Sequence, residues 1–283
     1  MTDERVLGNA VNVLLPLFRP AGFKRRRYSV VDIANSVVYA CTGGTSITQT
    51  TCCSILVSTP SRRDVQYHIS KIDISWIQSA VNNRVVLQAR AKDVLQQCAV
   101  NIAIDMTDTP PPTTGSRRTK AMSGADQPKA VYTTHFFFTH ASAYVRLHGR
   151  RFTLAMKYVR ADESLVDVVR YLLAEVQKTG IRIKCLFLDK GFFTAAAVMS
   201  YLNSVRIPYI IAAFPRGRKT GGRLSKLTRK RRDSFVVPDY EIIDSNTGEK
   251  CTFRLYAWQS TVRSGTGRRR ITASSTCSMP QAV

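Results

Sequence analysis

The spacing of apolar residues divides the chain into a helical part up to residue 98 and a longer part of alternating strands and helices. Over 61–98 the apolar residues recur at helical spacing, and Asp73 is placed to cap a helix that begins at Ile74. Nearer the start of the chain, an apolar run predicts a short helix that stops near Pro16. We therefore expect residues 1–98 to form a small, mainly helical N-terminal region.

Short apolar runs and turn residues dominate from residue 99 onward. The strands that these patterns predict are 99–105, an antiparallel pair within 131–159 that turns at 148–150, 181–188, 207–214, "SFVVPDYEII" and "CTFRLYAW". Two helices lie between them: one that Asp162 caps and Gly180 ends, and one over 194–205 that Thr194 caps. The order up to residue 214 predicts an α/β core, within 99–258, in which the strands 181–188 and 207–214 are parallel.

Three segments interrupt that order. Residues 108–115 contain three consecutive prolines and predict a loop, because proline cannot donate to a strand ladder. Residues 216–232 contain nine Lys or Arg and no acid, which predicts a basic insertion in the core. Residues 259–283 predict an irregular basic tail.

The charge of the chain is unusual for its ordinary apolar content. Its 283 residues include 42 Lys and Arg against 19 Asp and Glu, a formal net charge of +23, while 44% of residues are hydrophobic. Such an excess favours a polyanionic partner, and nucleic acid is the commonest, because each neutralised phosphate releases counterions. The longest apolar run, 6–18, is too short to span a bilayer, and the N-terminus lacks the positive start of a signal peptide. We expect a cytoplasmic, nucleoid-associated protein. Its seven cysteines form no CxxC pair, which indicates neither a zinc site nor a disulfide framework.

Two carboxylates carry the candidate chemistry. Asp105 and Asp189 each end an apolar run, at the carboxyl edge where open α/β sheets place their ligands. If their strands are parallel neighbours, about 4.8 Å apart, the two carboxylates converge and a divalent cation relieves their repulsion. Oxygen ligands favour Mg²⁺ or Mn²⁺, which can activate a nucleophile at a phosphodiester. Taken singly, each Asp is more simply a helix cap or a loop residue. Asp108 fits a structural role better than an accessory ligand, and Gly191 fits a strand-to-helix turn.

Three segments carry a resemblance to a known family: "NIAIDMTDTP", "GRRFTLAMKYVRADESLVDVVRYLL" and "KCLFLDKGFFTAAAVMSYLNSVRIPYIIAAFPRGRK". They resemble the DDE transposases of bacterial and archaeal insertion sequences, and the most specific part is "LDKGFF" followed by "YLNSVRIPYII". The resemblance implies an RNase H-like core, a mixed five-stranded sheet flanked by helices. It also implies that Asp105 and Asp189 are the first two catalytic acids, which bind Mg²⁺ or Mn²⁺. The implied reaction is cleavage at transposon ends and joining of the 3′-OH to target DNA, by a homo-oligomer on DNA.

The chain departs from the family in its third acid. The family carries a glutamate after the last strands, whereas this sequence has no Asp or Glu after Glu249, so we assign no third acid. We interpret the sequence as a transposase truncated or frame-shifted near residue 260. With two carboxylates the metal site is under-ligated, and we expect the chain to bind DNA but to cut it poorly or not at all.

The partner predicted by this reading is DNA, at both transposon ends and target. The N-terminal region and basic clusters supply the expected DNA contacts: Lys24, Arg25, Arg26, Arg27, Lys190, Arg216, Arg218, Lys219, Arg229, Lys230, Arg231 and Arg232. Three other classes stay open. They are a non-catalytic DNA-binding remnant that inhibits a full-length partner, an RNase H-like nuclease, and an RNA-binding protein, which only the charge suggests.

Overall fold

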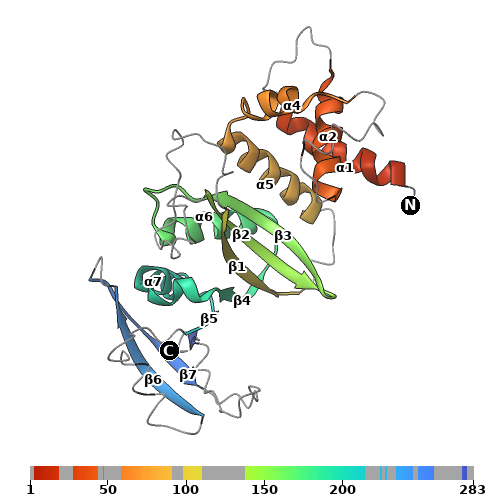
Figure 1. Ribbon diagram of the computed structural model, residues 1–283. Helices are drawn as coiled ribbons and strands as arrows, with labels where there is room; N and C mark the ends of the chain where they lie inside the picture. Colours follow the sequence, from red (N-terminus) through yellow and green to blue (C-terminus); the bar gives the residue numbers. More distant parts are fainter. Residues whose placement is uncertain are drawn as a thin grey trace, which may run out of the picture. The chain divides into compact units, whose positions relative to one another are not determined.

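The structure is a computed structural model. It describes residues 3–18, 28–43, 47, 59–90, 98–109, 138–213, 224, 227, 234–244, 248–257 and 276–278. The chain divides into two compact units, Met1–Arg84 and Val85–Val283 (Figure 1). The domain boundaries expected from the sequence, after residues 98 and 258, stay predictions.

The first unit is helical. Its helices are α1 (Asp3–Phe18), α2 (Val30–Gly43), α4 (Arg62–Ile69) and α5 (Ile74–Arg90), the last of which runs across the division between the units. Buried apolar side chains from several helices, among them Val11, Ile33 and Val65, form one core. Asp73 caps α5 as predicted, because its Oδ1 accepts hydrogen bonds from the backbone N–H groups of Ser75 and Trp76.

The sequence predicted that the first helix stops near Pro16, but helix α1 continues past this residue. Pro16 lies inside the helix, which continues to Phe18, a buried residue of the core. A proline in the last turn removes one hydrogen bond, and burial of Phe18 favours continuing the helix past it. The carbonyl of Pro16 accepts a hydrogen bond from Trp76 Nε1 at 3.3 Å, which ties α1 to α5.

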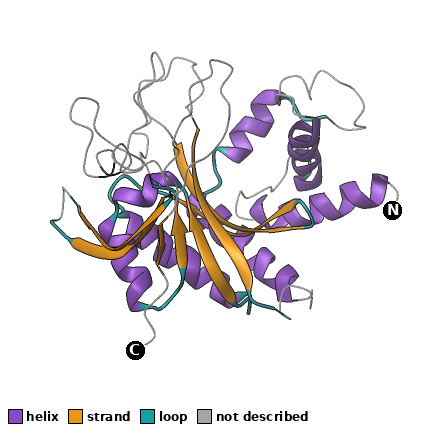
Figure 2. Cartoon of the chain, turned by 90° about the horizontal axis from the view of Figure 1, so that it is seen from below, coloured by secondary structure: helices purple, strands orange, loops and turns teal. Residues whose placement is uncertain are grey.

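The second unit is built on one mixed sheet. Its strands are β1 (Val100–Thr109), β2 (Phe138–Leu147), β3 (Arg150–Tyr158), β4 (Ile183–Leu188), β5 (Tyr209–Ile211), β6 (Phe235–Ile243), β7 (Lys250–Ala257) and β8 (Thr276–Ser278), in the order β3-β2-β1-β4-β5-β8-β7-β6. Strand β1 is antiparallel to β2 and parallel to β4, which is parallel to β5. The part β3-β2-β1-β4-β5 is a mixed five-stranded sheet with flanking helices, as the sequence resemblance implies, so the predicted α/β fold class is confirmed. Figure 2 shows its strands lying side by side.

Helices α6 (Leu165–Lys178) and α7 (Ala196–Ser204) cover one face of this sheet. Every second residue of the central strands faces them: Ile102 and Ile104 on β1 and Leu186 on β4 are buried. The predicted apolar stripe of α6 packs there, and Phe192 and Phe193 are buried in the same core. This buried layer fixes which residues of β1 and β4 face the other way.

The starts of two helices differ from the sequence predictions. Ser164, not Asp162, caps α6: its Oγ accepts from the backbone N–H of Asp167 at 3.2 Å and donates to the Asp167 carboxylate. Thr194 does not cap α7, because Lys190–Thr194 form a 3₁₀ helix, and α7 begins after Ala195. At α6 the capping contacts are local, between Ser164 and Asp167, whereas the first residue of α7 follows Ala195, which makes no side-chain cap.

The far part of the sheet extends the core. The two strands predicted from "SFVVPDYEII" and "CTFRLYAW" are β6 and β7, which pair antiparallel with an irregular register between Val237 and Tyr240. Three residues of the expected irregular tail form β8, which pairs with β5 and β7. The cysteines within the described ranges, Cys41, Cys98, Cys185 and Cys251, are free thiols. None of the described helices is long and apolar enough to cross a membrane.

Candidate metal and phosphate site

The parallel pairing of β1 with β4 brings Asp105 and Asp189 to neighbouring positions. Ile104 pairs with Leu188, and the two aspartates are the next residue on each strand. Because Ile104 and Leu188 point into the helix-covered core, and side chains alternate along extended backbone, both carboxylates belong to the opposite face of the sheet. The backbone at Asp189 is still extended, with φ −64° and ψ 160°. Neighbouring strands lie about 4.8 Å apart, close enough for two carboxylates to share a cation.

The sequence predicted a strand that ends at Asp105, but strand β1 extends beyond it. It continues to Thr109, because residues 105–109 pair antiparallel with the first half of β2. Asp105 therefore lies inside the strand, directly opposite Ser142, with its side chain 39% exposed. Residues 108 and 109 of the predicted loop 108–115 belong to β1 instead, and the rest of that predicted loop lies outside the described residues.

Asp189 is exposed and directly follows β4. It occupies the cap position of the 3₁₀ helix Lys190–Thr194, yet its side chain makes no capping hydrogen bond. This carboxylate therefore does not cap the helix that follows it, which would be the simplest structural role for an aspartate in this position. Lys190, the first residue of that helix, is exposed beside it, as a phosphate contact requires.

The turn after β4 does not depend on Gly191. Its φ lies outside the left-handed range, and a Cβ added there would meet Asp189 Oδ2 at an ordinary 4.0 Å. The expectation that glycine permits this turn was wrong. Asp108 has the structural role expected for it: its Oδ1 accepts a hydrogen bond from Thr139 Oγ1 at 2.5 Å, and alternation along β1 places it on the face opposite Asp105.

The donor set fits a hard divalent cation, though incompletely. Two carboxylates on adjacent strands of one sheet face supply the oxygen ligands that Mg²⁺ and Mn²⁺ prefer. Among the described residues, no group of three or more His, Cys, Asp or Glu side chains could hold a metal ion. Mg²⁺ commonly keeps several waters and binds through one or two carboxylates, so Asp105 and Asp189 suffice for a weak site.

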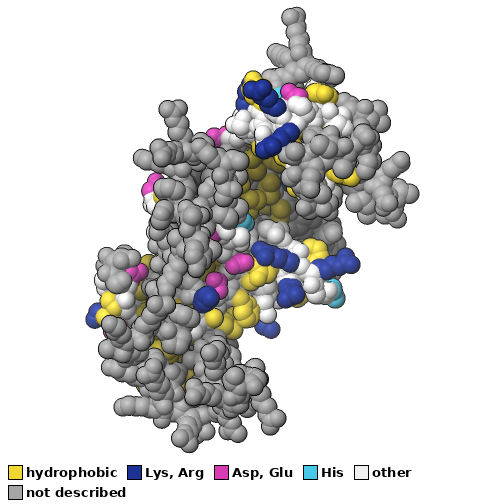
Figure 3. Space-filling model, viewed as in Figure 1, with side chains coloured by type: hydrophobic (Ala, Val, Ile, Leu, Met, Phe, Trp, Pro, Cys, Tyr) yellow, Lys and Arg dark blue, Asp and Glu magenta, His cyan; other side chains and the backbone are white. Residues whose placement is uncertain are grey.

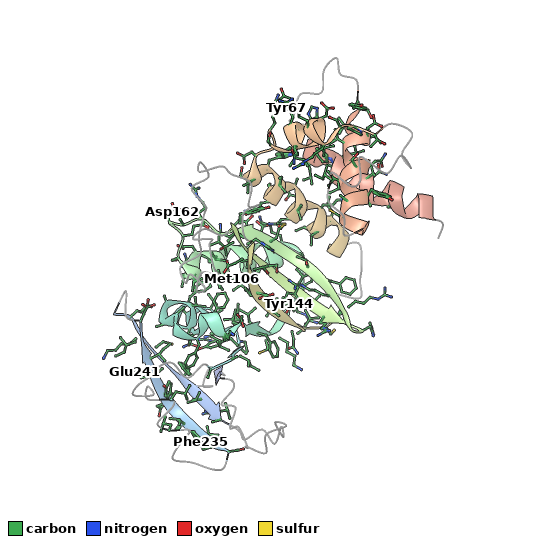
Figure 4. All side chains as sticks on the ribbon, viewed as in Figure 1. Tyr67, Met106, Tyr144, Asp162, Phe235 and Glu241 are labelled. Atoms are coloured by element: carbon green, nitrogen blue, oxygen red, sulfur yellow. The ribbon has the colours of Figure 1, made fainter. Side chains whose placement is uncertain are left out.

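A cation of the protein itself lies beside Asp105. Arg151 on β3 places Nη1 at 3.9 Å from Asp105 Oδ2, its Nη2 donates to Ser142 Oγ at 2.7 Å, and its guanidinium lies 3.8 Å from the centre of the Tyr144 ring. Tyr144 is labelled in Figure 4. Arg151 was not among the site residues expected from the sequence. The signal was available, since strand alternation on either side of the turn at His148 and Gly149 brings basic residues of β2 and β3 together.

The basic clusters assigned to DNA from the sequence lie, apart from Lys190, outside the described residues. They are Lys24, Arg25, Arg26, Arg27, Arg216, Arg218, Lys219, Arg229, Lys230, Arg231 and Arg232. Within the described part, exposed Arg146, Arg150 and Arg151 make the β2–β3 hairpin basic. Figure 3 shows Lys and Arg side chains gathered over this hairpin, with acidic side chains beside them.

Known proteins offer distant likenesses. No family model and no curated protein matches the sequence. A piggyBac transposase, in a cryo-EM structure of its synaptic complex with hairpin DNA, is similar at a TM-score of 0.44 and 12% identity, over 97% of this chain and 59% of that chain. The Drosophila P element transposase, in a strand transfer complex, is similar at a TM-score of 0.34 and 11% identity, over 70% of this chain and 44% of that one. This chain thus spans less than two thirds of either, and at these values function must follow from the residues of the site.

Proposed function

We propose that this chain is a DNA transposase of an insertion sequence, which cleaves and joins DNA strands with Mg²⁺ or Mn²⁺ held by Asp105 and Asp189. The observation that carries the proposal is the register of β1 and β4, in which Ile104 pairs with Leu188 and both carboxylates follow on one face. Two acids far apart in the sequence reach one place on a rigid sheet, and neither is needed there to cap a helix.

The chemistry of the site follows from those carboxylates. A divalent cation, when bound, lowers the pKa of an attacking water or hydroxyl and neutralises charge on the phosphodiester. Asp105 pairs with β2, and the preceding residue Ile104 pairs with β4, so the backbone that carries this carboxylate is in place before substrate arrives. Asp189 is followed by the exposed Lys190, to which the proposal assigns a contact with a DNA phosphate.

The charge of the chain supports DNA as the partner. A net charge of +23 gives a long-range attraction for any nucleic acid, and Arg151 of the β2–β3 hairpin lies beside Asp105. The basic segments 24–27 and 216–232 would add phosphate contacts that are independent of DNA sequence. Assembly as a homo-oligomer on DNA, which would bring two DNA ends together, is part of the proposal.

The number of acids favours a second candidate function. The described residues gather no third His, Cys, Asp or Glu side chain with Asp105 and Asp189 that could hold a metal ion. A site with two carboxylates binds metal weakly, and so we expect slow cutting. A protein that occupies DNA without cutting it, and thereby inhibits an active partner, is the alternative that this observation favours.

Metal binding and plasmid nicking together test the proposal. We expect the wild-type chain to bind Mn²⁺, measured by the electron paramagnetic resonance of the free ion, and to nick supercoiled plasmid slowly in Mn²⁺. Asp105→Asn and Asp189→Asn should each abolish both properties. Asp108→Asn is the matched control, because its amide oxygen can still accept from Thr139 and it faces away from the site. Mn²⁺ binding without nicking would favour the inhibitory protein, whereas Mn²⁺ binding that survives both substitutions would refute the metal site.

A further inference from the structure

The side chain of Arg151 is held in place by two neutral neighbours on the open face of the sheet. Its Nη2 donates to the hydroxyl of Ser142, which is buried, and its guanidinium stacks over the ring of Tyr144. Stacking and one hydrogen bond fix the plane of a side chain that otherwise has many rotamers. Arg151 therefore presents its remaining donors in one direction, although its side chain is 46% exposed.

Among the described residues, most of the hydrogen-bonding capacity of this guanidinium is left for a partner. A guanidinium has about five N–H donors, and Ser142 takes one of them. The carboxylate oxygen that lies beside it in the described part of the chain, Oδ2 of Asp105, is 3.9 Å from Nη1, which is beyond the range of a hydrogen bond. A side chain used only to neutralise Asp105 would be expected to approach it closely, with two parallel N–H···O bonds.

We propose that Arg151 binds a phosphate group of the DNA strand at the position next to the Asp105 carboxylate. The inference rests on the proposed function, which places a phosphodiester at this edge of the sheet. A planar, fixed guanidinium is the side chain best suited to bind two phosphate oxygens at once. Arg151 is thus a substrate-binding residue that neither the sequence nor the family resemblance indicated.

The arrangement also couples Arg151 to the charge of Asp105. Without a cation, the Asp105 carboxylate repels an incoming phosphate and partly neutralises Arg151. Removing the charge of Asp105 should free the guanidinium for an anion, even when no metal is present. Phosphate binding by an Asp105→Asn protein therefore reports on Arg151 independently of metal and of DNA cleavage.

The experiment measures binding of inorganic phosphate to the full chain, without metal, by ³¹P line broadening. In the Asp105→Asn background we expect phosphate to bind, and adding Arg151→Met should weaken it by about tenfold or more, the loss typical of a hydrogen-bonded charge pair. Adding Arg151→Lys should leave an intermediate affinity, because the charge stays while the planar fork is lost. Adding Arg150→Met is the matched control: it removes the same charge from the next residue of β3, which is also exposed, and should leave binding unchanged.

Each outcome decides one question. Loss of phosphate binding specific to Arg151 supports the inference. Equal losses of phosphate affinity for Arg150→Met and Arg151→Met would show a diffuse charge effect and overturn the inference. Phosphate affinity that Arg151→Met leaves unchanged would also overturn it, and so would the absence of phosphate binding in the Asp105→Asn background. Mn²⁺ binding by the wild type is measured separately. If it is absent while the Arg151 effect persists, the proposed function fails and the phosphate site stands.

Discussion

Lys157 and Glu163 form an ion pair at the point where β3 leads into α6, and its loss should destabilise the second unit. Lys157 Nζ lies 2.7 Å from Glu163 Oε1, with side chains only 9% and 20% exposed. The other carboxylate oxygen accepts the backbone N–H of Arg160 at 3.0 Å, and Nζ lies 4.6 Å from the centre of the Tyr171 ring. Glu163→Gln would leave the charged Lys157 side chain nearly buried and without its anionic partner.

The magnitude follows from burial. Removing one partner of a fully buried pair lowers the free energy of unfolding by about 3–5 kcal/mol. Because water still reaches part of Glu163, we expect Glu163→Gln to lower it by about 2–3 kcal/mol. The same change in the exposed pair beside it, Asp162→Asn, should cost at most about 1 kcal/mol, because Arg160 and Asp162 are largely solvated. At about 2–4 °C per kcal/mol, the two variants should be separable by melting temperature alone.

Urea unfolding of four proteins, followed by circular dichroism, measures the coupling: the wild type, Glu163→Gln, Lys157→Met and the double variant. The double variant should lose less stability than the sum of the single losses, because it no longer contains a buried charge without a partner. Additive losses, or a Glu163→Gln protein no less stable than Asp162→Asn, would refute the reasoning.

Two further predictions concern turns and caps. Gly149→Ala should lower the free energy of unfolding by about 1–2 kcal/mol, because φ is +76° there and the new methyl group would gain no contact that offsets the strain. Gly191→Ala, where φ is not in the left-handed range, should leave the melting temperature unchanged. The Ser164 hydroxyl holds the pKa of Asp167 below its ordinary value of 3.8. A carboxyl whose pKa is lowered by folding stabilises the fold above the unfolded pKa and loses that effect as the pH falls. The stability gap between wild type and Ser164→Ala should therefore narrow from about pH 6 to pH 3 in urea titrations, and a gap that stays constant would contradict the assignment.

The sequence predicts the order of the core elements well, because their patterns are local. Apolar runs with turn residues between them indicate β1, β4 and β5, and the turn at His148 and Gly149 indicates the β2–β3 hairpin. The proximity of Asp105 and Asp189 was also inferable, since parallel strands meet at their carboxyl ends. Their roles as metal ligands remain predictions.

The parts that the sequence did not predict depend on distant residues. The end of β1 is set by its pairing with residues 138–142, which lie far along the chain, so Asp105 looked like the end of a strand. The cap of α6 falls on Ser164 rather than Asp162, and Glu163 between them is bound by Lys157 of the preceding strand. Arg151 meets Asp105 only once three strands are aligned.

The described sheet ends at β6, and that strand is a poor template for another chain. Pro238 lies where the register between Val237 and Tyr240 is irregular, and it has no N–H to offer a new neighbour. The exposed acids Asp239 and Glu241 follow in the same strand. An interrupted, charged edge resists edge-to-edge aggregation. Copies of this protein that associate should therefore do so through their side-chain surfaces rather than by extending the sheet at β6.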